Sequence, residues 1–167
     1  MGTEIERKFL LAEFPDSVVR EGKLTPIKEQ RIEQTYLAID EAQELRVRKI
    51  QDLATGELEY THTFKNGRGL VREEIEYSIS AGLYDQLIRA LGAVPLTKVR
   101  TTAEWDGTLV EIDTYDQIQL RVLEVEFESE EAALRFQAPE WFGPDISSSK
   151  EYSNKTVWKK LQEGRSK

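Results

Sequence analysis

Cysteine is absent from this chain of 167 residues, and histidine occurs once, at His62. The absence of cysteine excludes disulfides, thiolate nucleophiles, zinc–thiolate sites and iron–sulfur clusters. A single histidine also excludes a metal site built from several imidazoles. Any catalytic chemistry must therefore come from other side chains.

Long apolar runs and an excess of positive charge are also missing. No apolar run approaches the roughly 20 residues of a membrane-spanning helix, and no apolar signal region follows the first residues. The 31 acidic residues outnumber the 23 basic ones and give a net charge of −8, whereas a general nucleic-acid binder needs a basic footprint. We therefore expect a cytoplasmic protein without membrane or nucleic-acid partners. The length suits a single domain, residues 1–167, as a monomer or homodimer.

Most of the chain alternates with the period of two residues that is typical of β-strands. Asn66–Gly69 and Asp106–Gly107 lie between such segments and predict hairpin turns. Helical spacing and capping residues predict short helices over about 83–91, 129–136 and 154–162. We expect a mainly β (α+β) fold, an eight-stranded β-barrel with a few peripheral helices. The predicted strands lie near residues 3–11, 33–39, 44–50, 58–65, 70–79, 97–106, 108–114 and 119–128.

The alternation places charged side chains on one face of each strand and apolar side chains on the other. In the first strand Glu4, Glu6 and Lys8 share one face, and Ile5 and Phe9 share the other. An antiparallel sheet with one solvated face would explain each strand singly. It explains less well why the two signs of charge occupy different strands. Carboxylate pairs stand at 4–6, 74–76, 111–113 and 124–126, and cation pairs stand at 46–48 and 98–100.

A closed sheet with these faces inward would have a charged lumen, which needs ions or a ligand to compensate the charge. Mg²⁺ and Mn²⁺ prefer carboxylate and water oxygens, often together with substrate phosphates. Arginine and lysine bind phosphate oxygens. Such a lumen suits metal-assisted phosphoryl transfer on a polyanion. The candidate cations are Lys8, Arg46, Arg48, Lys65, Lys98 and Arg100.

These residues resemble a known family. Glu4-x-Glu6-x-Lys8 is similar to the ExExK signature of the CYTH superfamily, the triphosphate tunnel metalloenzymes. Further matching segments follow in that family's order over essentially the whole chain, among them Leu45–Arg48, Lys98–Arg100 and Glu124–Phe127. The resemblance implies an eight-stranded antiparallel tunnel, open at both ends. It also implies metal-dependent hydrolysis of inorganic triphosphate to pyrophosphate and phosphate, as in the small bacterial inorganic triphosphatases.

The resemblance further assigns roles to individual residues. The implied ligands of Mg²⁺ or Mn²⁺ are Glu4, Glu6 and Glu126 for one ion, and Glu124, Asp113 and Glu74 for a second. The implied triphosphate clamp comprises Lys8, Arg46, Arg48, Lys65, Lys98 and Arg100, with Lys150 at one end of the tunnel. Expected catalytic residues are Lys8, Glu4, Glu6 and Tyr36, with a water activated by metal and carboxylate as the attacking group. Two alternatives stay open: Glu76 and Glu111 bind metal or orient arginines, and Tyr36 hydrogen-bonds Lys8 or packs.

Other functions also stay open. A nucleotide-directed member, such as a class IV-type adenylate cyclase or a nucleoside or thiamine triphosphatase, would need a pocket for the organic group at one mouth. A non-catalytic polyphosphate-binding module would keep only the cationic clamp. A structural β-domain would bind neither metal nor triphosphate, so neither would raise its melting temperature.

The tunnel also carries geometric predictions. The apolar partners should lie outside the barrel wall, beneath the three helices. His62 stands at an odd offset from Lys65 and should face away from the lumen. A β-bulge would flip the residues beyond it, and the strand over 119–128 is where we expect one. The apolar partners are Ile5, Phe9, Val47, Phe64, Ile75, Ile112, Val125 and Phe127.

Overall fold

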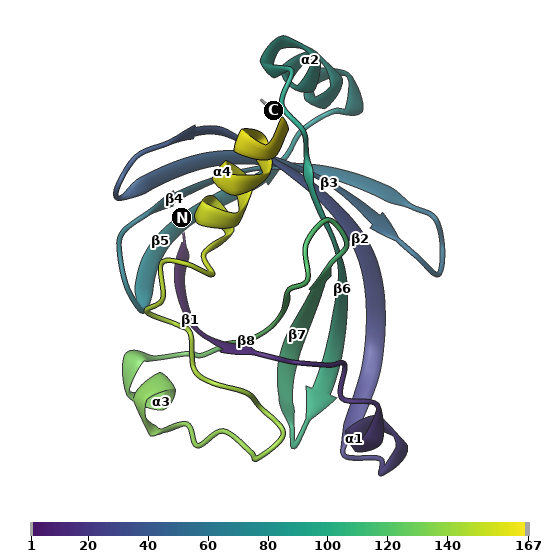
Figure 1. The fold of residues 1–167 in the computed structure, drawn as a ribbon, viewed down its shortest axis with the longest axis vertical. Coiled ribbons are helices and arrows are strands. Elements are labelled where there is room, and N and C mark those ends of the chain that lie inside the picture. The colour runs from purple at the N-terminus through teal and green to yellow at the C-terminus, as the bar shows by residue number, and fades with distance from the viewer. Residues whose placement is uncertain (1, 166–167) are drawn as a thin grey trace.

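The computed structural model describes residues 2–165, which form a closed barrel of eight antiparallel strands (Figure 1). Around the barrel the strands follow the order β1-β5-β4-β3-β2-β6-β7-β8, and β8 pairs with β1. This arrangement confirms the predicted fold class. The strands are β1 (Gly2–Leu10), β2 (Leu24–Ile39), β3 (Gln43–Asp52), β4 (Leu58–Asn66), β5 (Val71–Ser78), β6 (Leu96–Trp105), β7 (Thr108–Tyr115) and β8 (Arg121–Glu126).

Four short helices accompany the barrel, one more than the sequence predicts. They are α1 (Asp16–Arg20), α2 (Ala81–Leu91), α3 (Glu130–Arg135) and α4 (Asn154–Arg165). Ser80 and Ser129 cap α2 and α3, each accepting a backbone hydrogen bond from the first turn. Within residues 2–165, no helix combines the length and the apolar character that crossing a membrane would require.

The predicted hairpin turns are confirmed. Asp106 (φ 49°) and Gly107 (φ 77°) both have left-handed backbone between β6 and β7, as a two-residue type I′ turn requires. Gly67 (φ 123°) stands between β4 and β5, where a Cβ would lie 3.3 Å from the carbonyl oxygen of Val71. Both the backbone conformation and the limited space therefore favour glycine at this position.

The larger apolar core lies outside the barrel wall, as the alternation predicts. Phe9 packs on Phe142 with ring centroids 4.9 Å apart, and outward-facing Ile112 and Val125 are fully buried. The helices α1 and α3 and the segment 136–142 cover this part of the wall. One outward residue departs from the prediction. Ile75 on β5 remains 38% exposed because no helix covers it.

The last helix is placed differently from the prediction. The helix α4 packs on apolar side chains that face into the barrel at one end, instead of covering its outside. Trp158 of α4 stacks edge-on against Tyr36 of β2, with centroids 5.7 Å apart, and Val157 is buried beside it. Figure 1 shows α4, in yellow, lying across the ring of strands. The expectation of a tunnel open at both ends therefore needs correction at this end, where α4 covers part of the mouth and leaves a hollow beside it.

The second strand is longer and more irregular than predicted. It begins at Leu24 rather than near residue 33, and its register shifts between Pro26 and Lys28 and again between Tyr36 and Ala38. Its first half escapes prediction because Ile27 is 57% exposed, so no clear apolar face develops there. The bulge expected in the last strand is also wrong, because β8 pairs continuously with β1 and β7.

Candidate functional site

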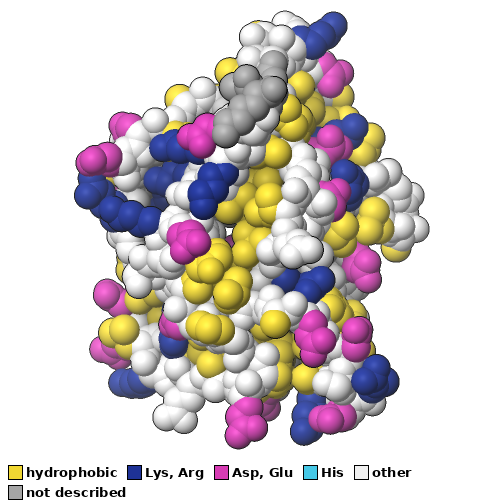
Figure 2. Space-filling model, in the orientation of Figure 1, with side chains coloured by type: hydrophobic (Ala, Val, Ile, Leu, Met, Phe, Trp, Pro, Cys, Tyr) yellow, Lys and Arg dark blue, Asp and Glu magenta, His cyan; other side chains and the backbone are white. Residues whose placement is uncertain are grey.

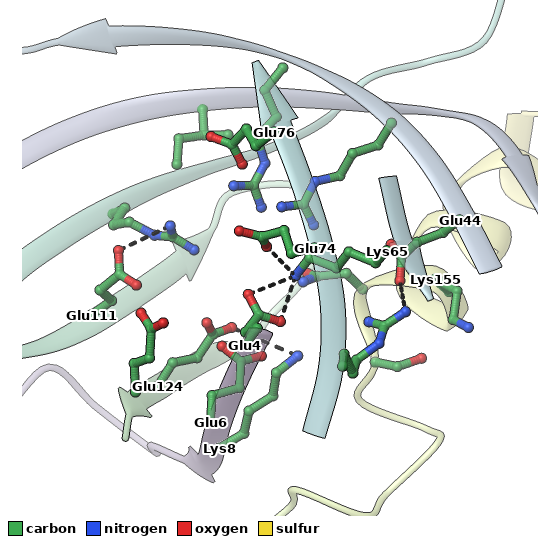
Figure 3. A pocket seen from close by; sticks show the side chains of 18 of the residues that line it. Glu4, Glu6, Lys8, Glu44, Lys65, Glu74, Glu76, Glu111, Glu124 and Lys155 are labelled. Atoms are coloured by element: carbon green, nitrogen blue, oxygen red, sulfur yellow. Dashed lines mark hydrogen bonds and ion pairs between the residues drawn. The ribbon is translucent and has the colours of Figure 1, made fainter. Parts of the chain in front are cut away.

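A cavity of about 240 Å³ occupies the inside of the barrel (Figure 3). All eight strands contribute to its lining, which is mostly ionisable, and the start of α4 adds Asn154 and Lys155. The lining brings together most of the predicted site residues: Glu4, Glu6, Lys8, Tyr36, Arg46, Arg48, Lys65, Glu74, Arg100, Glu124 and Glu126. Glu76 and Glu111 also line it, whereas His62 faces outward and stacks on Tyr77.

Three arginines form the most cationic part of the lining. Arg46 and Arg48 are buried on β3, and Arg48 Nε donates a 3.0 Å hydrogen bond to Oε1 of Gln34. Burial, together with the charges of Arg46 and Arg100, lowers the pKa of Arg48 to about 10. Like charges held this close inside a protein are stabilised by an anion among them.

Lys65 connects two carboxylates across the cavity. Its ammonium donates to Glu4 Oε1 at 2.9 Å and Oε2 at 3.1 Å, and lies 3.5 Å from Glu74 Oε2. Burial alone would raise the pKa of Glu4, but the Lys65 charge and the hydrogen bonds lower it to about 2. Burial and the neighbouring Glu4 raise the pKa of Glu74. The pair therefore holds one ionised and one more basic carboxylate side by side.

A second group of carboxylates stands where β1 pairs with β8. Glu6 lies opposite Glu126 in the ladder, and Lys8 lies opposite Glu124. The Lys8 ammonium is 3.7 Å from Glu124 Oε1. Burial, followed by the negative charge of Glu124, raises the pKa of Glu6 to about 8. A cation placed beside these carboxylates would relieve their mutual repulsion.

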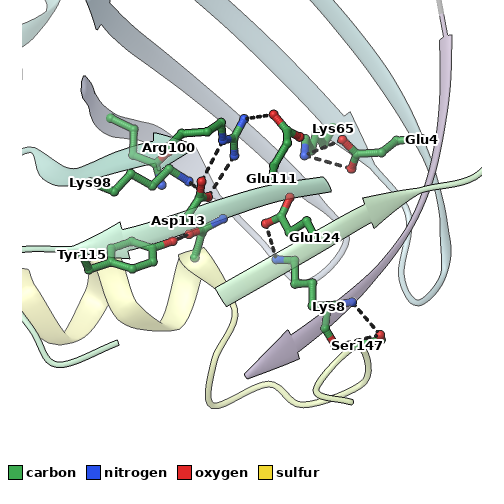
Figure 4. A network of polar contacts seen from close by, with 12 residues as sticks. Glu4, Lys8, Lys65, Lys98, Arg100, Glu111, Asp113, Tyr115, Glu124 and Ser147 are labelled. Atoms are coloured by element: carbon green, nitrogen blue, oxygen red, sulfur yellow. Dashed lines mark hydrogen bonds and ion pairs between the residues drawn. The ribbon is translucent and has the colours of Figure 1, made fainter. Parts of the chain in front are cut away.

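Asp113 and Lys98 lie behind the cavity lining (Figure 4). Both side chains are 0% exposed, and Asp113 Oδ2 is 2.8 Å from the Lys98 ammonium. Arg100 donates to both oxygens of Asp113, at 2.8 and 2.9 Å. Burial alone would raise the pKa of Asp113, but these cations lower it well below its ordinary value. In this position Asp113 fixes the direction of Arg100. That Asp113 binds a metal ion and that Lys98 binds phosphate both stay predictions.

Two further predicted site residues, Tyr36 and Lys150, lie in different surroundings. Tyr36 lines the cavity and its ring packs on Trp158, in agreement with the packing alternative, and the hydrogen bond to Lys8 stays a prediction. Burial and the charge of Glu44 raise the pKa of Tyr36 to about 12, which keeps the phenol protonated. Lys150 lines a neighbouring opening beside α4 instead of the cavity itself.

Sequence reasoning missed three charged residues of the lining. Arg72 on β5 donates to Glu44 Oε1 of β3 at 2.6 Å, and both side chains face the cavity. Their parity was the available signal, since Arg72 alternates with Glu74 and Glu44 alternates with Arg46. Lys155 had no such signal, because it belongs to a helix whose packing the strand pattern does not reveal. Glu111 lies 3.0 Å from Arg100, in agreement with the alternative in which it orients an arginine.

The donor set fits a hard divalent cation. The carboxylates Glu4, Glu6, Glu124 and Glu126 share one cavity, and oxygen donors are what Mg²⁺ and Mn²⁺ prefer. Burial and then the negative charge of Glu124 raise the pKa of Glu6, and such an ion would compensate that charge. Within residues 2–165, no three Asp, Glu or His side chains are already grouped so as to hold a metal. One reason is that Glu4 is turned toward Lys65 with both oxygens.

A closed antiparallel barrel with buried cations and carboxylates facing one cavity defines a charged-tunnel protein. The CYTH domain model matches residues 2–154, ending at the first residue of α4, and the chain belongs to the CYTH family. The inorganic triphosphatase of Nitrosomonas europaea is 36% identical over 159 residues, covering 93% of this chain and 96% of that protein. The inorganic triphosphatase of Acetivibrio thermocellus is 27% identical and covers 95% of each chain. The crystal structure of an inorganic triphosphatase superposes with a TM-score of 0.61 at 35% identity, covering 95% of each chain.

Proposed function

We propose that this chain is a metal-dependent triphosphatase that hydrolyses inorganic triphosphate to pyrophosphate and phosphate. The observation that carries the proposal is the cavity in which buried Arg46 and Arg48, together with the half-buried Arg100, face carboxylates from β1 and β8. A polyanion would compensate these cations, and a metal ion would compensate the carboxylates. Both curated relatives carry the name inorganic triphosphatase over nearly their full length.

The part of the cavity inside the barrel suits a compact substrate. Its volume of about 240 Å³ falls below the roughly 300–1,000 Å³ of pockets for drug-sized organic ligands. A linear inorganic triphosphate carries its negative charge on every phosphate and presents no apolar group. Such an anion suits a lining made almost entirely of ionisable side chains.

Membership of the CYTH family implies a divalent metal ion. We propose Mg²⁺ or Mn²⁺, held by Glu4, Glu6 and Glu126, with Glu124 and Glu74 supporting a second ion. A bound divalent ion would supply charge neutralisation at the phosphates and a more acidic water as nucleophile. Asp113 takes part through Arg100, the arginine that it orients.

The roles of the other residues follow from their charge and position. Arg46, Arg48 and Arg100 hold the phosphate oxygens by charge-assisted hydrogen bonds, and Lys8 and Lys65 add positive charge from the opposite wall. A water oxygen bonds to a terminal phosphorus while the bridging P–O bond on the far side breaks. Pyrophosphate leaves, and a carboxylate of Glu4 or Glu6 accepts the proton that the water loses. The Tyr36 phenol, kept protonated, can donate a hydrogen bond to the bound anion.

A substrate panel tests the proposal. Phosphate release is measured from triphosphate, pyrophosphate, ATP and thiamine triphosphate, each with Mg²⁺ and with Mn²⁺. We expect triphosphate to give the highest kcat/KM, and excess chelator to remove the activity. Preference for ATP or thiamine triphosphate would favour a nucleotide-directed or thiamine-directed enzyme. Tight triphosphate binding without any phosphate release would indicate a binding module.

A further inference from the structure

The barrel has an opening beside α4, at the rim formed by the β2–β3 and β4–β5 turns, which we call the side opening. The helix α4 covers part of one end of the barrel, so a ligand that enters at this end has to pass beside the helix. A hollow of about 690 Å³ lies beside α4, bounded by the β2–β3 turn, the β4–β5 turn and the segment 147–150. It shares Glu4, Glu6, Lys8, Arg72 and Lys155 with the tunnel cavity. The hollow and the cavity are therefore continuous.

The frame of this side opening is held firmly against β1. The segment 144–147 pairs with β1 beyond the part of β1 that β5 covers. Leu10 N–H donates to the Pro144 carbonyl at 2.9 Å, and Ile146 N–H donates to the Lys8 carbonyl at 2.9 Å. The Arg7 guanidinium donates to Asp145 Oδ2 at 3.1 and 2.8 Å. The segment that follows, with Lys150, is thus fixed close to Lys8, as Figure 4 shows for Ser147.

Lysines without ion-pair partners surround the side opening. Lys150, Lys155 and Lys159 line it, and none of them forms an ion pair within residues 2–165. Burial and the positive charges of Arg72 and Lys159 outweigh Glu44 and Asp40 and lower the pKa of Lys155. In the space-filling view, basic side chains gather beside α4 on the side of β4 and β5 (Figure 2). Hydroxyl groups of Ser147, Ser148 and Ser149 add hydrogen-bond donors.

The far end of the cavity has the opposite charge. Glu76, Glu111 and Glu126 line the cavity away from α4, and Glu76 and Glu126 are exposed. Figure 3 shows Glu111 on the side of the cavity opposite to Lys155. A polyanion that approached this end would meet carboxylates first, whereas one that approached the side opening would meet the lysines, which outnumber Asp40 and the Arg68-paired Glu41 there. The two ends therefore differ in the sign of charge that they attract.

We propose that the side opening is the access route and first binding site for the phosphate substrate, with Lys150, Lys155 and Lys159 capturing the anion before it enters the tunnel. The identity of the anion, inorganic triphosphate, rests on the proposed function. The segment 147–150 and the first two turns of α4 form this capture site. It accelerates association, and it contributes to catalysis only through delivery of the substrate.

A charge-reversal pair on α4 tests the proposal. Lys159 lines the opening, whereas Lys160 is exposed on the same helix and does not line it. Lys159→Glu and Lys160→Glu therefore change the net charge equally. At an ionic strength of about 0.01 M we expect Lys159→Glu to lower kcat/KM for triphosphate about threefold to tenfold, more than it lowers kcat. Lys160→Glu should stay at the wild-type value. At about 1 M, where the Debye length is only about 3 Å, the difference should disappear.

The outcomes separate this inference from the proposed function. Equal kcat/KM values for the two variants at low salt would overturn the access route, whether both fall or neither does. Lys150→Glu provides a second variant, expected to behave like Lys159→Glu. If the wild-type protein releases no phosphate from triphosphate, the proposed function fails, and triphosphate affinity is then compared by calorimetry. Weaker binding by Lys159→Glu alone would keep the capture site, and equal binding by both variants would reject it.

Discussion

Lys65 donates hydrogen bonds to both carboxylate oxygens of Glu4, at 2.9 and 3.1 Å. The relationship joins a cation proposed to bind phosphate to a carboxylate proposed to bind metal. In the chain alone the two neutralise each other, since both are largely buried. Binding of metal and triphosphate would exchange this one pair for two new partners. The two ligands should therefore bind cooperatively, because each frees a residue for the other.

Lys65→Ala tests that exchange. We expect triphosphate affinity to fall about tenfold or more, because a charge-assisted hydrogen bond is worth about 1.5–3 kcal/mol. Affinity for Mg²⁺ or Mn²⁺ without triphosphate should rise, because Glu4 loses its competing partner. Calorimetry of each ligand alone measures both effects. Lys49→Ala, which removes a lysine from the outer face of β3, is the control. Parallel losses of metal and triphosphate affinity in Lys65→Ala would contradict the exchange.

The arginine clamp gives a second prediction. Arg48→Ala removes a buried guanidinium held by Gln34 in the cavity wall. The loss of about 1.5–3 kcal/mol of binding should raise KM for triphosphate by one to two orders of magnitude. Arg31→Ala on the outer face of β2, paired with Asp116, should leave KM unchanged. Steady-state kinetics on both variants measures the difference, and a wild-type KM in Arg48→Ala would exclude this arginine from the clamp.

Strand alternation made much of the site predictable. Glu6, Arg48 and Glu126 are separated by long stretches of sequence, yet each has the parity that turns its side chain inward once the sheet closes. Side chains of equal charge also cluster, because Arg46 and Arg48 are two positions apart on one strand and therefore face the same side of the sheet. Parity could equally have identified Arg72. A two-residue period therefore carries information about position in the barrel without any knowledge of strand order.

Features outside that period were not predictable. The helix α4 has the amphipathic pattern of any surface helix, and its sequence does not reveal that Trp158 packs against the inward-facing Tyr36. The bulge between Tyr36 and Ala38 depends on how β2 fits β3, which is a property of two strands together. Parity also could not separate Asp113 from the other carboxylates, because its burial behind Arg100 is a tertiary effect.

The carboxylates at the β1–β8 ladder give a third prediction. Glu6→Gln and Glu126→Gln each replace a proposed metal ligand by a neutral side chain of the same size. We expect turnover to be lost, while triphosphate still binds through the cations. Glu73→Gln, on the exposed outer face of β5, is the matched control. Phosphate release and triphosphate calorimetry are measured for each variant. Unchanged activity in excess chelator would contradict a metal role for both residues.

Glu6 also makes stability depend on pH. Its pKa is about 8 in the folded protein against an ordinary value of 4.5. Between these values the folded state keeps a proton that the unfolded chain has released, so the free energy of unfolding falls as pH rises. Glu6→Gln should therefore lose less stability than the wild type between about pH 5 and about pH 8. Urea unfolding across this range measures the difference. Added Mg²⁺ or Mn²⁺ should stabilise the wild type more at the upper end, where ionised Glu6 gains a partner.

Asp113 provides the last prediction, which decides between a metal ligand and an anchor for the arginine. Asp113→Asn leaves Arg100 and Lys98 buried without their shared counter-charge. Breaking a buried pair from one side costs about 3–5 kcal/mol, so the free energy of unfolding should fall by about that amount. The pKa of Asp113 is depressed in the folded state, so its contribution is present above the ordinary carboxyl pKa and is lost as pH falls below it.

Three measurements on Asp113→Asn then separate the two roles. An anchor predicts lower stability near neutral pH, a smaller loss of stability in acid than the wild type shows, and unchanged metal affinity in calorimetry. KM for triphosphate should rise in Asp113→Asn, because Arg100 is no longer held in place. Arg100→Lys should raise KM in the same way, since a single ammonium cannot bind both oxygens of Asp113 as the guanidinium does. A metal ligand predicts the reverse, with metal affinity reduced at least tenfold and stability near that of the wild type. Asp113 already accepts hydrogen bonds from Arg100 and forms an ion pair with Lys98, so we expect the results that an anchor predicts.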